Sequence, residues 1–196
     1  EGSGNLTARG GSIAGNGGFI ETSGLGYLHI NDAPNAGATA GKVGTWLLDP
    51  VDVHIVNSGN QSLSGGVFTS STGNTNIKPN TIETALATQD VVINTGAGTS
   101  GNGDIFIDDA LNITTTTQSL TLNAHRDIIA GANISSTATG TLTLNMNAAR
   151  DIVVGANITA AAGTLNLNLI AGRDIQVNDD ISVTLGVLNA NLNATG

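Results

Sequence analysis

An Asp-Ile pair that recurs every 23 or 24 residues constrains the fold of this chain more than any other feature. The four pairs are Asp104-Ile105, Asp127-Ile128, Asp151-Ile152 and Asp174-Ile175, at spacings of 23, 24 and 23 residues. A fixed period of about 20 to 50 residues is the signature of architectures in which one supersecondary unit stacks on the next. We therefore expect one elongated body rather than two globular domains.

Each repeat contains three short apolar segments separated by turns. The Asp-Ile segment is followed by a segment around Ile134, Ile158 or Ile181, and then by an alternating Leu-x-Leu segment. We align the Leu-x-Leu segments as Leu120/Leu122, Leu142/Leu144 and Leu165/Leu167, with Leu188 and Leu192 in the same column. Alternation with a period of two is typical of β-strands with one buried face.

Three short strands cannot bury their apolar faces alone, whereas stacked coils form a continuous core. Connections between parallel strands are nearly always right-handed. We therefore predict an all-β fold, a right-handed parallel β-helix with coils of about 23 residues, in which Ile105, Ile128, Ile152 and Ile175 form one buried column. At a strand spacing of about 4.8 Å, roughly eight coils would give a rod about 40 Å long. A leucine-rich repeat has a similar period, but its distinct convex segment and its Leu/Asn signature are missing from these units.

The first half of the chain lacks this regularity. We divide the chain into irregular coils with loops over residues 1–100 and regular coils over 101–196 that continue them. Residues 57–76 are rich in Gly, Ser, Thr and Asn, which predicts a protruding loop or hairpin around Val67-Phe68. Asn80 and Glu83 form a capping-box pattern after Pro79, which predicts a short helix near 80–88 on the side of the rod.

Charge and hydropathy exclude several classes of partner. The chain of 196 residues has a net charge of −9 with only six Lys plus Arg, so it cannot neutralise a run of phosphates. We expect no binding to nucleic acid. No stretch approaches 18 consecutive apolar residues, so we expect no membrane insertion. The chain has no cysteine, which excludes disulfides and thiol chemistry.

The charged and amide residues of the repeat favour a structural interpretation. Three of the repeated Asp residues directly follow an Arg. We expect a ladder in which the Asp side chains accept turn amides and the Arg side chains offset the stacked carboxylates. This predicted ladder comprises Asp104, Asp127, Asp151, Asp174, Arg126, Arg150 and Arg173. A second ladder is expected from Asn123, Asn145 and Asn168, which follow the Leu-x-Leu segments in corresponding positions.

We predict no catalytic, cofactor or metal site. A polysaccharide-active β-helix enzyme is the main alternative, but its chemistry needs a base beside carboxylates that hold a cation and the substrate. The few basic residues follow the structural repeat instead. His29, His54 and His125 lack metal-ligand spacing. The pairs Asp108-Asp109 and Asp179-Asp180 stand outside any calcium-binding nonapeptide repeat. Trp46, the only Trp, is flanked by two leucines and is expected in the core.

Three segments of the first half carry a resemblance to a known family. They are Gly17-Gly18-Phe19-Ile20-Glu21-Thr22-Ser23-Gly24, Gly44-Thr45-Trp46-Leu47-Leu48-Asp49-Pro50 with Val53-His54-Ile55, and Thr81-Ile82-Glu83-Thr84-Ala85-Leu86. In order and spacing they resemble filamentous-haemagglutinin-like exoproteins, the adhesins of two-partner secretion systems. The later repeats look like the generic β-helical coils of that family.

The resemblance implies a secreted protein on the surface of a Gram-negative bacterium, exported through an outer-membrane transporter partner. It also implies a role in attachment, aggregation or biofilm formation. The family's amino-terminal secretion motifs are not visible, and the next repeated Asp would fall at position 197. We therefore expect an internal fragment downstream of the secretion domain, with a stalk or display role. A glycan-binding segment is the alternative role, and surface glycans or other copies of the chain are the alternative partners.

Overall fold

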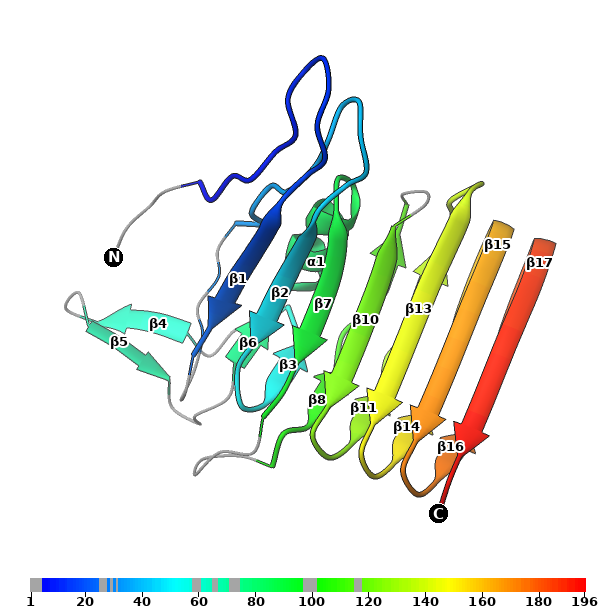
Figure 1. Ribbon diagram of the computed structural model, residues 1–196. Helices are drawn as coiled ribbons and strands as arrows, with labels where there is room; N and C mark the ends of the chain where they lie inside the picture. The colour runs from blue at the N-terminus through cyan, green and yellow to red at the C-terminus, as the bar shows by residue number, and fades with distance from the viewer. Residues whose placement is uncertain are drawn as a thin grey trace.

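The chain folds as a β-solenoid in which nearly all strands are parallel. The computed structural model describes residues 5–24, 28, 30, 32–57, 61–64, 67–70, 75–96, 102–114 and 118–196. These residues form about six turns with coils about 23 residues apart. In Figure 1 the near strands point down, the strands behind them point up and the coils advance from left to right, so the solenoid is right-handed. The estimate of eight coils is too high, because a hairpin, a helix and long connections use up the first half.

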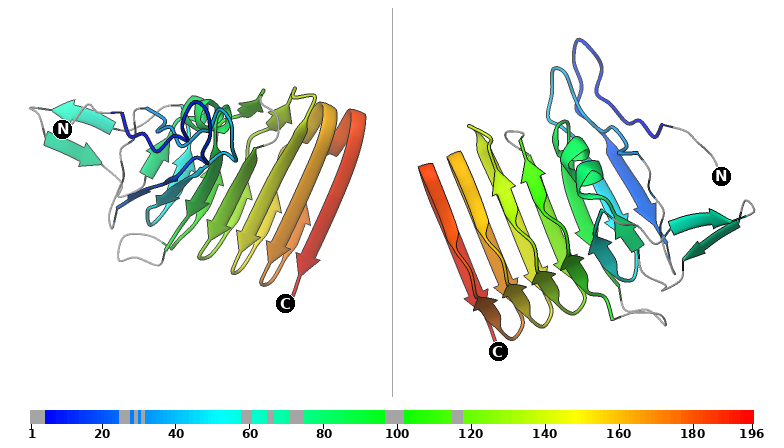
Figure 2. Two further views of the ribbon diagram at one scale, coloured as in Figure 1. Left: turned by 45° about the horizontal axis from the view of Figure 1, so that its top comes forward. Right: turned by 180° about the vertical axis from the view of Figure 1, so that it is seen from behind.

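Two parallel sheets form the opposite sides of the solenoid. The wide sheet contains β1 (Phe19–Ser23), β2 (Thr45–Asp49), β7 (Asp90–Asn94), β10 (Ser119–Ala124), β13 (Thr141–Ala148), β15 (Ile158–Ala171) and β17 (Ile181–Ala194). The narrow sheet contains β6 (Thr75–Ile77), β3 (Val53–Ile55), β8 (Ile105–Ile107), β11 (Ile128–Ala130), β14 (Ile152–Val154) and β16 (Ile175–Val177). Figure 2 shows both sheets from two further sides.

A third side is formed by strands that precede the wide-sheet strands in each coil. β9 (Leu111–Ile113) and β12 (Ile134–Ser136) stack in register with the first residues of β15. β15 passes around the corner to the wide sheet at Gly163, whose φ is 76°. A Cβ at Gly163 would lie 2.2 Å from the carbonyl oxygen of Gly140 in the coil below, so only glycine fits this corner.

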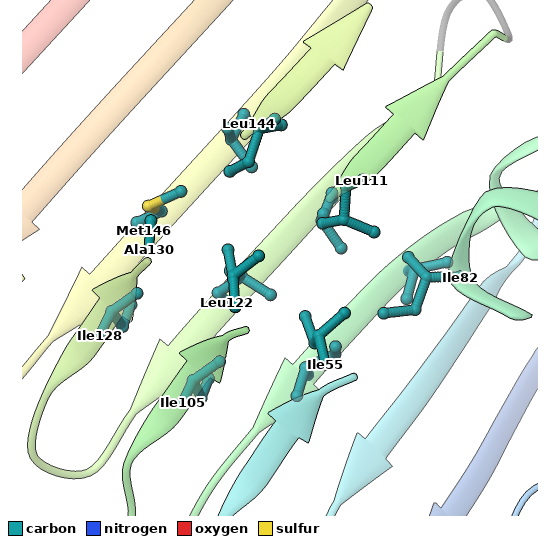
Figure 3. Close-up of a cluster of buried hydrophobic side chains, with 14 of the residues drawn as sticks. Ile55, Ile82, Ile105, Leu111, Leu122, Ile128, Ala130, Leu144 and Met146 are labelled. Atoms are coloured by element: carbon teal, nitrogen blue, oxygen red, sulfur yellow. The ribbon is translucent and has the colours of Figure 1, made fainter. Parts of the chain in front are cut away.

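The predicted isoleucine column is confirmed by the strand register. Ile105 pairs with Ile128, Ile128 with Ile152, and Ile152 with Ile175. The first three side chains are fully buried, and Ile175 is half-buried because β16 is the last strand of the narrow sheet. Figure 3 shows two of them, Ile105 and Ile128, together with Leu122, Leu144 and Met146 of the wide sheet. The core is therefore a narrow apolar layer that runs the length of the rod.

The predicted alignment of the Leu-x-Leu segments is wrong by two residues at one step. Leu120 lies beside Leu144 rather than Leu142, and Leu122 lies beside Met146. The step from β10 to β13 is 24 residues, and Met146 occupies a position where the neighbouring coils have Leu. The apolar pattern of β13 therefore includes Met146 as well as Leu142 and Leu144. Leu120 and Leu122 could be aligned either with Leu142 and Leu144 or with Leu144 and Met146, and the structure has the second alignment. The following step is as predicted, because Leu142 and Leu144 pair with Leu165 and Leu167. At the last step Leu188 lies beside Leu165 as expected, but Leu192 lies beside Leu169, and Ala190 takes the place beside Leu167.

The first half departs from the regular coil at two places. The predicted hairpin is confirmed as β4 (Gln61–Ser64) and β5 (Val67–Ser70), which are antiparallel. The chain then returns as β6, which pairs with the edge of β3 away from β8. β6 follows β3 in sequence but lies one coil before it in space. This reversal closes the narrow sheet at its amino-terminal end.

The predicted helix is confirmed as α1 (Pro79–Leu86), but its predicted cap is wrong. The N-cap is Lys78, which makes no side-chain cap hydrogen bond, because Pro79 fills the first helical position and starts the helix before Asn80. Glu83 instead accepts a hydrogen bond from the backbone N–H of Asn112 in β9, at 2.6 Å. Ile82 and Leu86 are fully buried. The helix therefore covers the edge of β9 that no strand pairs with, which removes an exposed strand edge from the side of the rod.

Candidate functional site

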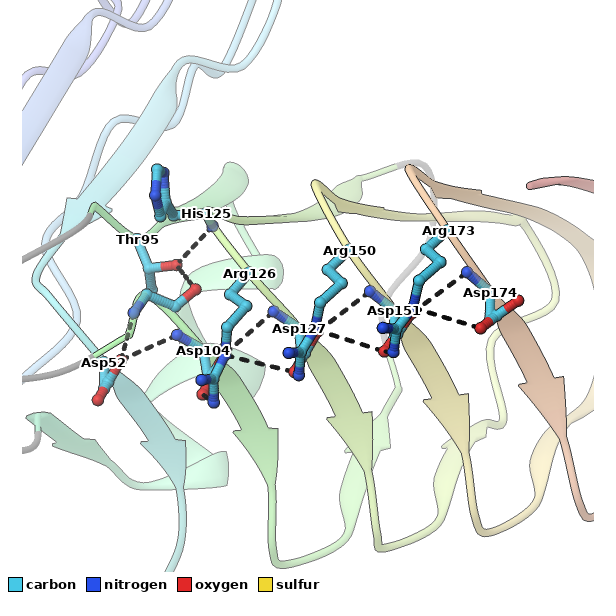
Figure 4. Close-up of polar contacts among 11 residues, drawn as sticks. Asp52, Thr95, Asp104, His125, Arg126, Asp127, Arg150, Asp151, Arg173 and Asp174 are labelled. Carbon is cyan, nitrogen blue, oxygen red and sulfur yellow. Dashed lines mark hydrogen bonds and ion pairs between the residues drawn. The ribbon is translucent and has the colours of Figure 1, made fainter. Parts of the chain in front are cut away.

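The repeated Arg and Asp residues form a continuous ladder at the turn before the narrow sheet (Figure 4). Each Arg forks onto the Asp of the preceding coil. The Nε atoms of Arg126, Arg150 and Arg173 lie 2.8, 2.7 and 2.7 Å from the Oδ1 atoms of Asp104, Asp127 and Asp151, and the Nη2 atoms bond to Oδ2 of the same carboxylates. Bidentate pairing of this kind is the strongest ion-pair geometry that proteins use.

The carboxylates of Asp104, Asp127 and Asp151 also bind the backbone of the next coil. The N–H groups of Asp127, Asp151 and Asp174 donate to Oδ1 of the Asp one coil before, at 3.0, 3.1 and 3.3 Å. Each Arg Nε also lies within 3.4 Å of the Asp that follows it in sequence. One Asp therefore holds a side chain and a main-chain amide of its neighbour, and this locks the register between coils.

Asp52 begins this ladder and was missed in the sequence. Its Oδ1 accepts hydrogen bonds from the N–H groups of Gly103 and Asp104, at 2.7 and 2.8 Å, and the residue is 9% exposed. Gly103 stands at the register position that Arg126 takes in the next coil. Asp52 is followed by Val rather than Ile and has no preceding Arg, so the repeated motif did not reveal it.

The ladder shifts the pKa values of Asp151 and of its three Arg residues. The hydrogen bond from Arg173 holds the pKa of the Asp151 carboxyl below its ordinary value, against the opposing effect of burial. Hydrogen bonds to the Asp carboxylates raise the pKa values of the Arg126, Arg150 and Arg173 guanidinium groups. Both directions favour the charged pair. Asp151 and the three guanidinium groups are thus held in their charged forms, as structural ion pairs require.

The amide ladder exists, but not in the predicted register. Asn168 donates from Nδ2 to Oδ1 of Asn145 at 2.8 Å, and Asn145 donates to the hydroxyl of Thr121 at 3.0 Å. Asn123 belongs to the neighbouring column, where it bonds to Asn94 and Asn147 at 2.7 and 2.8 Å. The prediction that Asn123 stacks with Asn145 is wrong for the same reason as the Leu alignment. A third column joins Asn189 to Asn166 at 2.8 Å, so three parallel amide columns run along the wide sheet.

The outer surface of the last four wide-sheet strands is uncharged. We call this surface the amide face. It comprises Ser119, Thr121, Asn123, Thr141, Thr143, Asn145, Asn147, Thr164, Asn166, Asn168, Ile170, Val187, Asn189, Asn191 and Asn193. Thirteen of these fifteen residues carry an amide or a hydroxyl group, and none is charged. In a chain of net charge −9, the acids of this region are confined to the turns.

The histidines do not form a metal site in the described part of the chain. His54 Nδ1 lies 2.6 Å from Asp108 Oδ2, and its ring stacks on Phe106 at a centroid distance of 4.4 Å. His125 is exposed beside the turn, and His29 lies outside the described residues. Among the residues that are described, no three His, Cys, Asp or Glu side chains gather as metal ligands would. The His54–Asp108 pair joins residues 54 positions apart, and no sequence motif indicates it.

The Asp pairs at the turns and the single Trp have ordinary structural partners. Asp109 accepts a hydrogen bond from the backbone N–H of Asn57 at 2.7 Å. Within the described ranges, no group of potential metal ligands surrounds Asp180. Trp46 is fully buried, as predicted, and its Nε1–H donates to Thr22 at 3.0 Å. Gln89, which was not singled out, is fully buried; its Oε1 accepts the Ala36 N–H and its Nε2 donates to the Pro34 carbonyl at 3.0 Å.

Comparisons with known proteins add no identity. No family model, no curated protein and no solved structure matches the chain. Among the described residues no helix is both long and apolar enough to cross a membrane. Two candidate sites follow from the geometry. The Arg–Asp ladder joins neighbouring coils, and the amide face is an uncharged outer surface of the wide sheet.

Proposed function

We propose that the protein is a non-enzymatic stalk segment that extends and displays a secreted bacterial surface adhesin of the filamentous-haemagglutinin-like, two-partner secretion type. The observation that carries this proposal is the unbroken Arg–Asp ladder. The ladder consists of the most regularly repeated motif of the chain, and its side chains bond one coil to the next. A repeat that bonds to its own copies builds length, and length is what a stalk supplies.

Two further observations support the same role. The three segments that resemble the exoprotein family lie within or beside β1, β2, β3 and α1, which shape the amino-terminal half of the solenoid. Asp52, Asp104, Asp127 and Asp151 are each occupied by an Arg fork or by backbone amides, which leaves them unsuited to hold a cation and a substrate. The proposal includes no cofactor and no turnover. Its partners are the outer-membrane transporter during export, and not nucleic acid or lipid.

An export and display experiment tests the proposal. The chain, with an epitope tag at its carboxyl end, is fused behind the secretion domain of a two-partner exoprotein and produced in a Gram-negative host with the matching transporter. We expect the tag to be accessible to antibody on intact cells, and to require the transporter. Purified chain should leave acidic polysaccharides uncleaved. Retention of the chain inside the cells, or cleavage that is lost when one Asp is replaced, would overturn the stalk proposal.

A further inference from the structure

The amide face has the composition of a contact surface for another neutral surface. Acids flank it on the amino-terminal side, where Glu21, Asp49 and Asp90 project from β1, β2 and β7. From β10 to β17 no charge interrupts it. Charged residues are depleted at the centres of protein interfaces, because burying an unpaired charge is unfavourable. The segregation of charge in a chain of −9 therefore makes this broad face a region where two copies can approach with less repulsion than at the acidic strands β1, β2 and β7.

The chemistry of the face is self-complementary. The amides bond along the columns, as Asn168 to Asn145 and Asn189 to Asn166 show, and each uses at most one N–H and one lone pair in these bonds. An amide has two N–H donors and an oxygen with two lone pairs, so every Asn keeps donor and acceptor capacity for a partner. A surface that both donates and accepts everywhere can face a rotated copy of itself, which is what a two-fold interface requires.

Exposed apolar side chains on the same face point to a partner rather than to solvent alone. Ile170 is 40% exposed and Val187 is 52% exposed, and both project outward among the amides of β15 and β17. Four strands about 4.8 Å apart, each with four outward positions about 6.7 Å apart, give on the order of 500 Å² per copy. Two copies would bury about 1,000 Å², which is the lower limit for a specific interface.

We propose that the amide face is a self-association surface on which a second copy of this chain docks, wide sheet against wide sheet, as a weak two-fold dimer. Face-to-face sheets pack about 10 Å apart with their strands nearly aligned. With the axis near β13 and β15, the acids of β1, β2 and β7 stay outside the contact. The inference rests on the geometry of the face and does not depend on the proposed stalk role.

The test uses sedimentation velocity of the purified chain over a range of concentrations and salt. We expect a monomer–dimer equilibrium that strengthens with salt, because salt screens the repulsion between two copies of charge −9. Asn145→Asp places a carboxylate in the centre of the face while keeping the fold, since the carboxylate still accepts from Asn168 and the Thr121 hydroxyl, which now accepts from Asn145, can rotate to donate to it. It should raise the dimer Kd by at least about tenfold, because like charges then meet across the axis.

Matched variants separate this surface from others. Gln176→Glu adds the same charge on the outside of the narrow sheet, and Val177→Lys adds a charge at the open end of β16; neither should change Kd. Thr143→Asp, which keeps an acceptor for Asn166, repeats the central test if Asn145→Asp melts early. A chain that stays monomeric at every concentration and salt overturns the proposal. So does association that only Val177→Lys abolishes, or a monomer that binds neutral polysaccharide through Asn145.

Discussion

The two halves of the solenoid hold their coils together in different ways. From β8 onward, each coil repeats the same residues in the same places, so that Ile stacks on Ile, Arg forks onto Asp and Asn bonds to Asn. Before β8, most of the side-chain contacts that join coils are made by residues with no counterpart in the neighbouring coils. Gln89 binds the backbone of residues 34 and 36 and Glu83 binds β9, while Asp52, at the start of the ladder, makes the amide contact that the later coils repeat.

The difference shows what periodicity contributes to a solenoid. In the regular half a coil can be exchanged for its neighbour, because its contacts are to copies of itself. In the irregular half the turns differ in length. Backbone N–H and C=O groups that find no partner in the neighbouring coil are therefore hydrogen-bonded by individual polar side chains. We therefore expect damage to spread along the regular half and to stay local in the irregular half.

The largest expected effect comes from a charge within the stacked core. Ile152→Asp buries a carboxylate between Ile128 and Ile175 with no partner, and we expect a loss of about 4 kcal/mol or more in the free energy of unfolding. Val153→Asp is the matched control, because Val153 projects outward from the same strand and should cost much less. Urea titration followed by circular dichroism measures both. Equal losses would mean that β14 is not stacked as described.

Breaking the Arg–Asp ladder should produce a graded series. The acceptor carboxylates of Arg126, Arg150 and Arg173 have side chains that are 3%, 8% and 15% exposed. A more buried carboxylate loses more when its cation is removed. We expect Arg126→Ala to lower Tm most, Arg150→Ala less and Arg173→Ala least. Arg9→Ala serves as the control outside the ladder and should leave Tm unchanged; a flat series would show that the ladder is not what joins the coils.

A single side chain of the irregular half gives the next prediction. Gln89→Ala leaves the buried Ala36 N–H and Pro34 carbonyl without their partners, which should cost about 2 kcal/mol. The exposed neighbour Thr84 provides the control substitution, Thr84→Ala. Hydrogen exchange should rise around residues 34–37 and 89–91 and stay unchanged beyond residue 118. Exchange that also rises throughout the regular coils would contradict the idea that damage in this half stays local.

The smallest expected effect is a dependence on acid. The pKa of Asp151 is lowered in the folded chain, so its pairing stabilises the fold fully above the ordinary carboxyl pKa of about 3.9. That stabilisation is lost as the pH falls through the lowered, folded-state pKa. Arg173→Ala removes the cause of the shift. The difference in Tm between the original chain and Arg173→Ala should therefore be constant from pH 7 to pH 5 and shrink as the pH falls below the ordinary carboxyl pKa and through the lowered one.

The sequence predicted the features that repeat and missed those that occur once. The solenoid, its period, the isoleucine column and the Arg–Asp contacts follow from residues whose spacing is conserved from coil to coil within the chain. The registers of Leu120 and Asn123 were wrong because Met146 extends an apolar pattern and a 24-residue step resembles a 22-residue one. Asp52 and Gln89 were missed because their partners are backbone groups 50 or more residues away, and no local pattern marks such a contact.

Disulfide trapping tests the register of the stacked coils most directly, because the chain has no cysteine of its own. In the structure Thr121 lies beside Asn145 on neighbouring strands, whereas Asn123 is displaced by two residues, which places its Cα about 8 Å from that of Asn145. A disulfide requires Cα atoms within about 7 Å. Thr121→Cys with Asn145→Cys should close within a monomer on mild oxidation, and Asn123→Cys with Asn145→Cys should not. Closure of the second pair in preference to the first would contradict the 24-residue register and with it the ladder that joins the coils.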